Sequence, residues 1–156
     1  MDGRPTEIMP QLTVLMLAVY NVFVGVYHAN LTKRMEAETA IYGAPKTKIK
    51  HGWWAFLYVG ILALCWWASD WNWWMPAAGV LVRKPFFDTA YNLARFGRFT
   101  YISNEVKIIT GLWDALRRGK TIDWIHWVIF RQNVWVYQAI YLTATLYITF
   151  FKLNVR

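Results

Sequence analysis

The sequence predicts an all-α integral membrane protein, a four-helix bundle with an interfacial amphipathic helix in its second long loop. Three observations predict this fold. The 156-residue chain is 57% hydrophobic and 19% aromatic, which is unusually apolar for a soluble domain. It contains apolar windows near the roughly 20 helical residues needed to cross a hydrocarbon core of about 30 Å. Its 11 Trp residues cluster near the ends of those windows, as in aromatic belts.

The whole chain, 1–156, is expected to form one membrane domain. Its first span is expected to stay as an anchor, because the opening residues MDGRPTE lack the basic start of a cleavable signal. The short connection at 70–72 favours a span on each side of it. Polar residues 131–133 leave two starts for the last span, Trp124 or a position nearer Val134. The four spans are expected at about 8–28, 52–69, 73–95 and 124–151.

The net charge of +8 is concentrated in two long loops, 31–51 and 96–122. Basic loops remain on the cytoplasmic side of a membrane, so both loops are expected in the cytoplasm and both termini on the opposite side. Anionic lipid headgroups explain the positive charge more simply than nucleic acid does. The expected partner is therefore the lipid bilayer, with no nucleic acid.

An amphipathic helix is expected at 104–118 within the second loop. Gly119 is a helix stop, and Arg117 and Arg118 occupy the last turn, where their side chains can reach lipid phosphates. The helix is expected either to rest in the headgroup region or to pack onto the bundle. The apolar residues along its face are Val106, Ile109, Leu112, Trp113 and Leu116.

Polar residues recur at helical spacing inside the expected spans. Such residues are costly in a bilayer and usually face the bundle interior or a cavity. Gly25 in the first span permits close approach of a neighbouring helix. The residues that share a face are Asn21 and His28 in the first span, Lys84, Asp88, Asn92 and Arg95 in the third, and Asp123, His126 and Asn133 in the fourth.

The expected topology brings all three histidines and two carboxylates to the cytoplasmic side of the membrane. Imidazole and carboxylate groups are suitable ligands for zinc or another divalent metal, and no other cofactor is expected. The sequence therefore predicts metal-dependent hydrolysis of a lipid-linked or amphiphilic substrate. The candidate metal ligands are His28, His51, Asp123 and His126. The candidate catalytic residues are Asp88 as ligand or general base, Asn92 as an orienting residue and Arg95 as a phosphate binder.

Other uses of these residues remain open. Asp88 could serve only as an ion-pair partner of Lys84 or Arg95, and two histidines such as His28 and His126 could ligate haem. The protein could instead be a non-catalytic accessory or scaffold subunit of a larger membrane complex. It could also form a holin-like homo-oligomeric pore, with the polar face of the third span along an aqueous lumen.

Five segments occur in order between residues 50 and 142: KHGWWAFLYVG, VRKPFFDTAYNLAR, FTYIS, TIDWIHWVIFRQN and IYL. In this pattern the chain resembles a group of small, uncharacterised polytopic membrane proteins of bacterial and phage genomes. The resemblance implies a membrane protein and no particular activity. It places eight polar residues inside the shared segments: His51, Arg83, Asp88, Asn92, Arg95, Asp123, His126 and Asn133.

Overall fold

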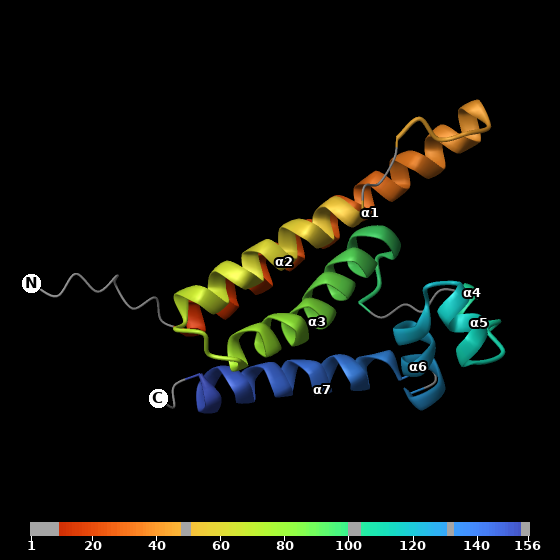
Figure 1. Cartoon of the computed structure of the whole chain (residues 1–156). Helices are drawn as coiled ribbons and strands as arrows, with labels where there is room; N and C mark the ends of the chain where they lie inside the picture. The colour runs from red at the N-terminus through yellow and green to blue at the C-terminus, as the bar shows by residue number, and fades with distance from the viewer. Residues whose placement is uncertain (1–9, 48–50, 100–103, 131–132, 154–156) are drawn as a thin grey trace, which may run out of the picture.

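The computed structural model describes residues 10–47, 51–99, 104–130 and 133–153, and these ranges contain helices and no strand (Figure 1). The predicted all-α class is confirmed. The elements are α1 (Pro10–Tyr42), α2 (His51–Ala68), α3 (Trp74–Phe96), α4 (Asn104–Lys107), α5 (Leu112–Arg117), α6 (Thr121–Phe130), α7 (Val134–Tyr147) and a π-helical turn η1 (Ile148–Lys152).

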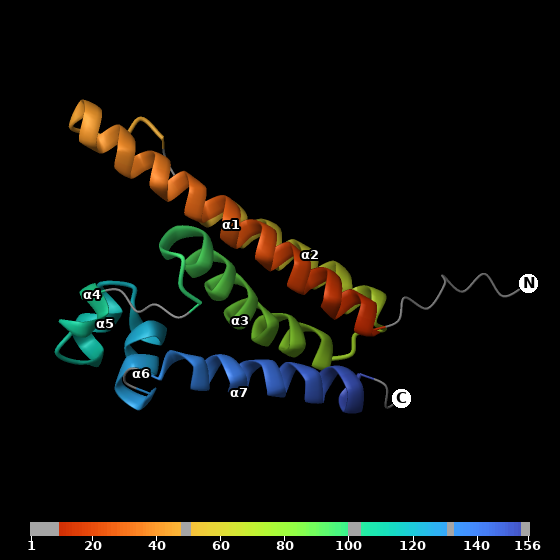
Figure 2. The same ribbon diagram turned by 180° about the vertical axis from the view of Figure 1, so that it is seen from behind.

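The four long helices form an elongated bundle. Figures 1 and 2 show α1 and α2 side by side, with α3 between this pair and α7. The short helices α4, α5 and α6 gather at the end of the bundle that is remote from both termini. Residues of the second long loop are thereby placed beside the ends of α3 and α7.

The first helix is longer than the sequence predicts. We expected a span ending near residue 28 and a separate short helical run around Lys33–Ala40, but α1 is continuous from Pro10 to Tyr42. Residues 31–42 include several strong helix formers, and Arg34 forms an i,i+4 ion pair with Glu38 at 2.9 Å. The helix ends at Gly43, whose φ of 74° lies in the left-handed region that favours glycine.

Gly25 lets α1 approach α3 closely, as the sequence predicts. A Cβ atom at this position would lie 2.7 Å from the backbone oxygen of Phe87 and 3.1 Å from the Cβ of Ala90. Both neighbours belong to the face of α3 that packs on α1. The expectation of a close helix contact is confirmed, and any larger residue at this position must displace backbone.

A buried hydrogen-bond network joins α1, α2 and α3. Asn21 is fully buried on α1, and its amide nitrogen donates to the Leu17 carbonyl at 2.8 Å and to the Tyr58 hydroxyl at 3.1 Å. The Tyr58 hydroxyl donates in turn to the Gly79 carbonyl at 2.6 Å. Apolar side chains surround this network, including Val14, Leu17, Leu62, Met75 and Val82. These hydrogen bonds favour one register of α1, α2 and α3, because a shift would leave the buried Asn21 amide nitrogen and the Tyr58 hydroxyl without partners.

The expected continuous span at 124–151 is divided in two. α6 and the helical stretch 135–152 are inclined to each other by 109°. Asn133, the residue before α7, leaves helical geometry with φ −87° and ψ 57°. The last long helix therefore does not begin at Trp124. It begins at Val134, the later of the two starts expected for the last span.

The expected amphipathic helix at 104–118 is also divided, into α4 and α5. Gly111 between them is extended, with φ −174°, and β-branched residues precede it, a combination that disfavours helix. Val106 and Ile109 are buried, whereas Trp113 is 81% exposed. The predicted single apolar face is therefore split between a packed part and an exposed part.

One described helix, α1, is long and apolar enough to cross a membrane, and α6 with residues 135–152 would add a second if that bent pair is a single span. α2 is apolar but shorter by the same measure, and α3 carries the charged residues Arg83, Lys84 and Asp88. A long apolar helix near the N-terminus agrees with membrane association.

Candidate functional site

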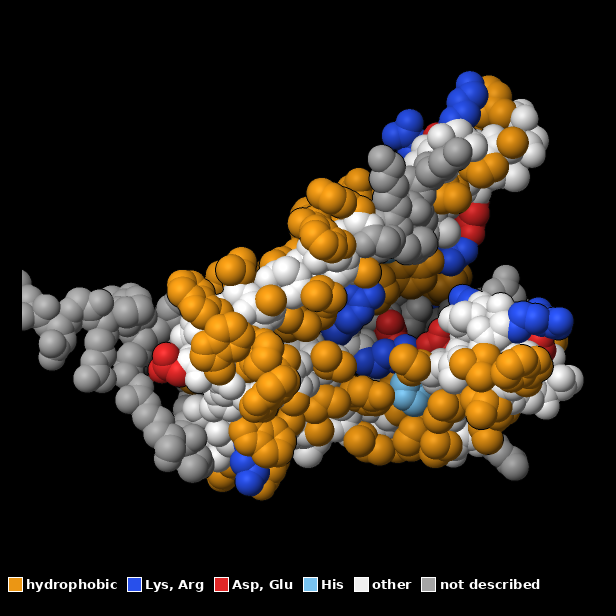
Figure 3. All heavy atoms as spheres, viewed as in Figure 1, with side chains coloured by type: hydrophobic (Ala, Val, Ile, Leu, Met, Phe, Trp, Pro, Cys, Tyr) orange, Lys and Arg blue, Asp and Glu red, His pale blue; other side chains and the backbone are white. Residues whose placement is uncertain are grey.

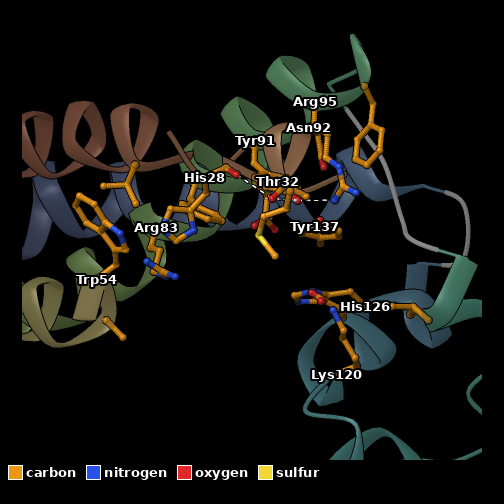
Figure 4. Close-up of a pocket in the computed structure, with 18 residues that line it drawn as sticks. His28, Thr32, Trp54, Arg83, Tyr91, Asn92, Arg95, Lys120, His126 and Tyr137 are labelled. Carbon is orange, nitrogen blue, oxygen red and sulfur yellow. Dashed lines mark hydrogen bonds between the residues drawn. The ribbon is translucent and has the colours of Figure 1, made fainter. Parts of the chain in front are cut away.

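A cavity of about 600 Å³ lies where α6 meets the bundle (Figure 4). Its lining residues come from α1, α2, α3, α4, α6 and α7, together with Lys120 at the start of α6. This volume is within the range of small-molecule binding sites. The end of the bundle that carries the second long loop thus contains a site large enough for a ligand.

The cavity brings together six of the seven residues that the sequence singles out. They come from three helices that are far apart in the sequence. The side chain of the seventh residue, His51, lies outside the described part of the chain. The six that line the cavity are His28, Asp88, Asn92, Arg95, Asp123 and His126.

Lys84 forms ion pairs with two of the carboxylates that the sequence predicts for the site. Its Nζ lies 2.8 Å from Asp88 Oδ2 on the same helix and 2.8 Å from Asp123 Oδ1 on α6. The side chains of Lys84 and Asp88 are mostly buried, whereas that of Asp123 is 46% exposed. The ion pair that the sequence allowed within α3 therefore exists, and it also joins α3 to α6.

His126 lines the cavity from α6 and is 7% exposed. Its ring stacks on Tyr137 of α7, with the ring centroids 4.3 Å apart and the planes 8° from parallel. Its Nε2 lies 3.3 Å from the Tyr141 hydroxyl, and its Nδ1 is buried without a hydrogen-bond partner among the described residues. The stacking and the Nε2 contact hold the imidazole in place, and its Nδ1 makes no hydrogen bond to the described residues.

His28 has different surroundings. It is buried on α1 with its ring edge-on to Trp54 of α2 and Phe87 of α3, at centroid distances of 5.8 and 5.7 Å. Its backbone carbonyl accepts a hydrogen bond from Thr32 at 2.9 Å. His28 thus belongs to the aromatic wall of the cavity, across from the polar groups of α6.

Arg95 lines the cavity from the last turn of α3. Its Nη1 donates to the Tyr91 hydroxyl at 2.5 Å, its Nη2 pairs with Glu36 of α1, and its guanidinium lies 4.8 Å from the ring centroid of Phe96. The charge of Arg95 is therefore already balanced by Glu36. Asn92, one turn earlier on α3, is buried beside it and also lines the cavity.

Two further cations line the cavity without such compensation. Among the described residues, no carboxylate lies within 4.0 Å of Arg83 or Lys120. The Arg83 guanidinium lies 4.9 Å from the ring centroid of Phe87 and 5.4 Å from that of Tyr58. Figure 4 shows Arg83 and Lys120 on opposite sides of the cavity. Neither cation is held by a carboxylate at ion-pair distance in this part of the chain, although Arg83 also acts electrostatically on Asp88.

The described residues contain no group of three His, Cys, Asp or Glu side chains placed to hold one metal ion. A physical reason is visible at the carboxylates, because the Lys84 ammonium occupies the position between Asp88 and Asp123 that a cation would take. The predicted zinc site also includes His51, whose side chain is not described, so the site stays a prediction.

Several cavity residues are not among those that the sequence singles out for the site. Arg83 lies inside the third expected span, where the sequence assigns it no role, and Lys120 follows a helix stop, a position typical of a solvated loop. Trp54 belongs to an expected aromatic belt, and Tyr137 lies inside the last expected span. Only the turn at Gly119, with a φ of 64°, followed by α6, brings Lys120 back to the cavity.

Comparison of the chain with protein-family models, with curated proteins and with solved structures finds no match. The geometry and charge of the cavity are therefore the observations that bear on function.

Proposed function

We propose that the protein is a membrane protein whose cavity binds an amphiphile with a phosphate or similar anionic headgroup. The observation that carries this proposal is that two cations, Arg83 and Lys120, line the cavity without a described carboxylate within 4.0 Å, and that the other wall of the cavity is aromatic. Guanidinium and ammonium groups are the side chains that recognise phosphate. Aromatic and aliphatic walls suit the apolar part of the same molecule.

The distribution of side chains supports a membrane environment. Polar residues such as Asn21, His28 and His126 are buried, whereas large apolar residues on α1, α2 and α7 are exposed. Figure 3 shows apolar side chains over the outer faces of α2 and α7. Contiguous apolar surface of this extent is costly in water and favourable in lipid. The exposed residues include Leu15, Val19 and Phe23 on α1, Phe56, Val59 and Trp67 on α2, and Trp135, Ile140 and Leu146 on α7.

Four spans are part of the proposal. At a rise of about 1.5 Å per residue, α1, α2, α3 and α7 with η1 each approach or exceed the length needed to cross the hydrocarbon core. The two basic loops would then lie in the cytoplasm with anionic headgroups beside them, and both termini on the other side. In this arrangement α6, inclined to α7, lies at the cytoplasmic interface. The cavity opens at that level, where lipid headgroups are found.

Binding can be tested with the full chain purified in a mild detergent. It is titrated calorimetrically with dihexanoyl phosphatidylglycerol and with the uncharged dihexanoyl glycerol. We expect the phosphate-bearing lipid to bind at least about tenfold more tightly, the factor for one charge-assisted hydrogen bond. Arg83→Gln and Lys120→Gln should each remove most of this difference. The matched control is Arg117→Gln, which removes the same charge from a side chain that is 79% exposed and outside the cavity.

Equal affinity for the charged and the uncharged lipid, or no binding of either, would contradict the proposal. A weakening by Arg117→Gln as large as that by Arg83→Gln would also contradict it, because the effect would then come from overall charge.

A metal-dependent hydrolase is the second candidate function. The observation that favours it is that His28, Asp88, Asp123 and His126 line the same cavity. Metal analysis of the purified protein tests it, with His126→Ala as the comparison. Stoichiometric zinc in the parent chain that is lost in the variant is the expected result. Absence of metal from both proteins, each loaded with zinc before dialysis, would contradict a metal-dependent hydrolase.

A further inference from the structure

We propose that the cavity opens sideways to the bilayer between α2 and α7, and that this lateral opening holds the acyl chains of a phospholipid whose headgroup lies in the cavity. The inference rests on the proposed function and specifies its substrate class, a membrane-resident lipid rather than a soluble phosphate ester. The floor of the lateral opening is the strip of α3 that carries Val80, Arg83 and Lys84.

Contacts on each side of this strip place it between α2 and α7. The Arg83 guanidinium lies 5.4 Å from the ring centroid of Tyr58 on α2. The Lys84 ammonium lies 5.8 Å from the ring centroid of Tyr137 on α7. Val80 precedes Arg83 by three residues and Lys84 by four, so it lies between them on the helix face, one turn nearer the start of α3.

The strip is open at Val80. This side chain is 60% exposed, although α3 packs against α1, α2 and α7. On α2, Ala55 is exposed and also lines the cavity, so the cavity reaches the surface beside that helix. Figure 3 shows charged and histidine side chains in a hollow between the apolar surfaces of α2 and α7. The polar interior of the cavity therefore continues into an apolar surface without a wall between them.

The strip changes from apolar to charged along α3. Pro76 and Val80 precede Arg83 and Lys84, and the cavity continues from there toward the end of the helix. Arg83 lies nine residues after the start of α3 and thirteen before its end, about 14 Å and 20 Å along the axis. In the proposed topology the end of α3 is cytoplasmic. A phospholipid of the cytoplasmic leaflet has the same order, with its headgroup toward the cytoplasm and its chains toward the bilayer centre.

The charge of Arg83 at this depth favours an anionic partner. A charged side chain near the middle of a span is costly unless it faces a partner or a polar cavity. Lys84 is paired with Asp88 and Asp123, whereas Arg83 lies beyond 4.0 Å from every carboxylate of the described residues. A phosphate in the cavity supplies that partner, and the chains attached to it cover Val80. A soluble phosphate ester leaves the apolar part of the strip uncovered.

The test compares a lipid with its own headgroup. The detergent-purified full chain is titrated with dihexanoyl phosphatidylglycerol and with soluble glycerophosphoglycerol. We expect Val80→Trp, which fills the lateral opening, to weaken binding of the lipid at least about tenfold, because each buried methylene group contributes about fourfold. The affinity for glycerophosphoglycerol should stay that of the parent chain. The matched control is Val19→Trp, at an α1 position that is 62% exposed and outside the cavity, and it should change neither affinity.

Each outcome bears on a separate statement. If the parent chain binds the lipid and Val80→Trp binds it as tightly as Val19→Trp does, the lateral opening is overturned and the proposed function stands. A parent chain that binds glycerophosphoglycerol as tightly as the lipid also overturns it, and assigns the cavity to a soluble phosphate ester. Failure of the parent chain to bind either ligand overturns both. If Val80→Trp does not fold, Ala55→Trp obstructs the same opening from α2, and unchanged lipid affinity in that variant overturns the opening.

Discussion

At the scale of single residues, Lys84 determines how the cavity is closed. Its ammonium is the contact between Asp88 of α3 and Asp123 of α6, two residues 35 positions apart in the sequence. Removing the charge leaves two carboxylates facing each other in a mostly buried position, where like charges repel and desolvation is not compensated. The arrangement of α6 against the bundle therefore depends on one side chain.

Substitution of Lys84 should destabilise the fold. We expect Lys84→Met to lower the free energy of unfolding by about 1–3 kcal/mol, less than a fully buried ion pair costs because Asp123 is half-exposed. Denaturant unfolding in detergent, followed by circular dichroism, measures the change. Asp123→Asn in the Lys84→Met background should then recover part of the loss. A loss equal to that of Lys33→Met, at an exposed position on α1, would contradict this role of Lys84.

Residue spacing predicted the polar faces of the site but not their partners. The i,i+4 positions of Lys84 and Asp88 on one helix led directly to an ion pair, because neighbours on a helix face must meet. The pairing with Asp123 and the position of Lys120 depend on how α6 turns back onto α3. Helix spacing carries no information on that turn, so Lys120 was expected only as a loop cation and Arg83 was given no role in the site.

At the scale of elements, the contact between α1 and α3 depends on Gly25. Gly25→Ala places a methyl group 2.7 Å from the backbone oxygen of Phe87, which cannot move as a side chain could. We expect a loss of about 1–3 kcal/mol, the usual cost of overpacking. Gly60→Ala is the matched control, because nothing lies within 4 Å of its Cβ and alanine favours helix. Thermal unfolding in detergent distinguishes the two, and equal stability of both variants would argue against a tight contact.

The helices themselves were predicted unevenly for identifiable reasons. The apolar window at 52–69 located α2 closely, and the short connection at 70–72 located α3 in spite of its charged residues. The continuity of α1 through residues 29–42 was missed because these turns are more polar, and a polar extension gives no hydropathy signal that joins it to the span. The splitting of 104–118 was missed because apolar spacing outweighed the β-branched residues before Gly111, where the helix breaks.

At the scale of the whole molecule, several polar side chains are buried in a largely apolar core, and many large apolar side chains are exposed, which suits the proposed lipid environment. Four spans also predict the sides of the loops. In a Cys65→Ser background, we expect Ala44→Cys, between α1 and α2, to react with a membrane-impermeant maleimide only from the cytoplasmic side. Ser69→Cys, between α2 and α3, should react only from the other side. Labelling of both positions from the same side would contradict the four-span topology.

The convergence of the site was predictable only through topology. Spacing on single helices grouped Asp88 with Asn92 and Asp123 with His126, and the charge of the loops placed both groups at one end of the bundle. The cavity agrees with that grouping, since it contains all four residues. The Lys84 ammonium between the carboxylates could not be foreseen, because it depends on the relative position of α3 and α6.

The most direct test of the central claim is native mass spectrometry of the full chain extracted from its own membrane. The account predicts one retained phospholipid per chain in the parent protein and in the double control Lys33→Gln/Arg117→Gln. It predicts loss of that lipid in Arg83→Gln/Lys120→Gln, because these two of the cations that line the cavity have no carboxylate within 4.0 Å among the described residues, whereas Arg95 is paired with Glu36. Equal lipid retention in the cavity variant and the control would contradict the account.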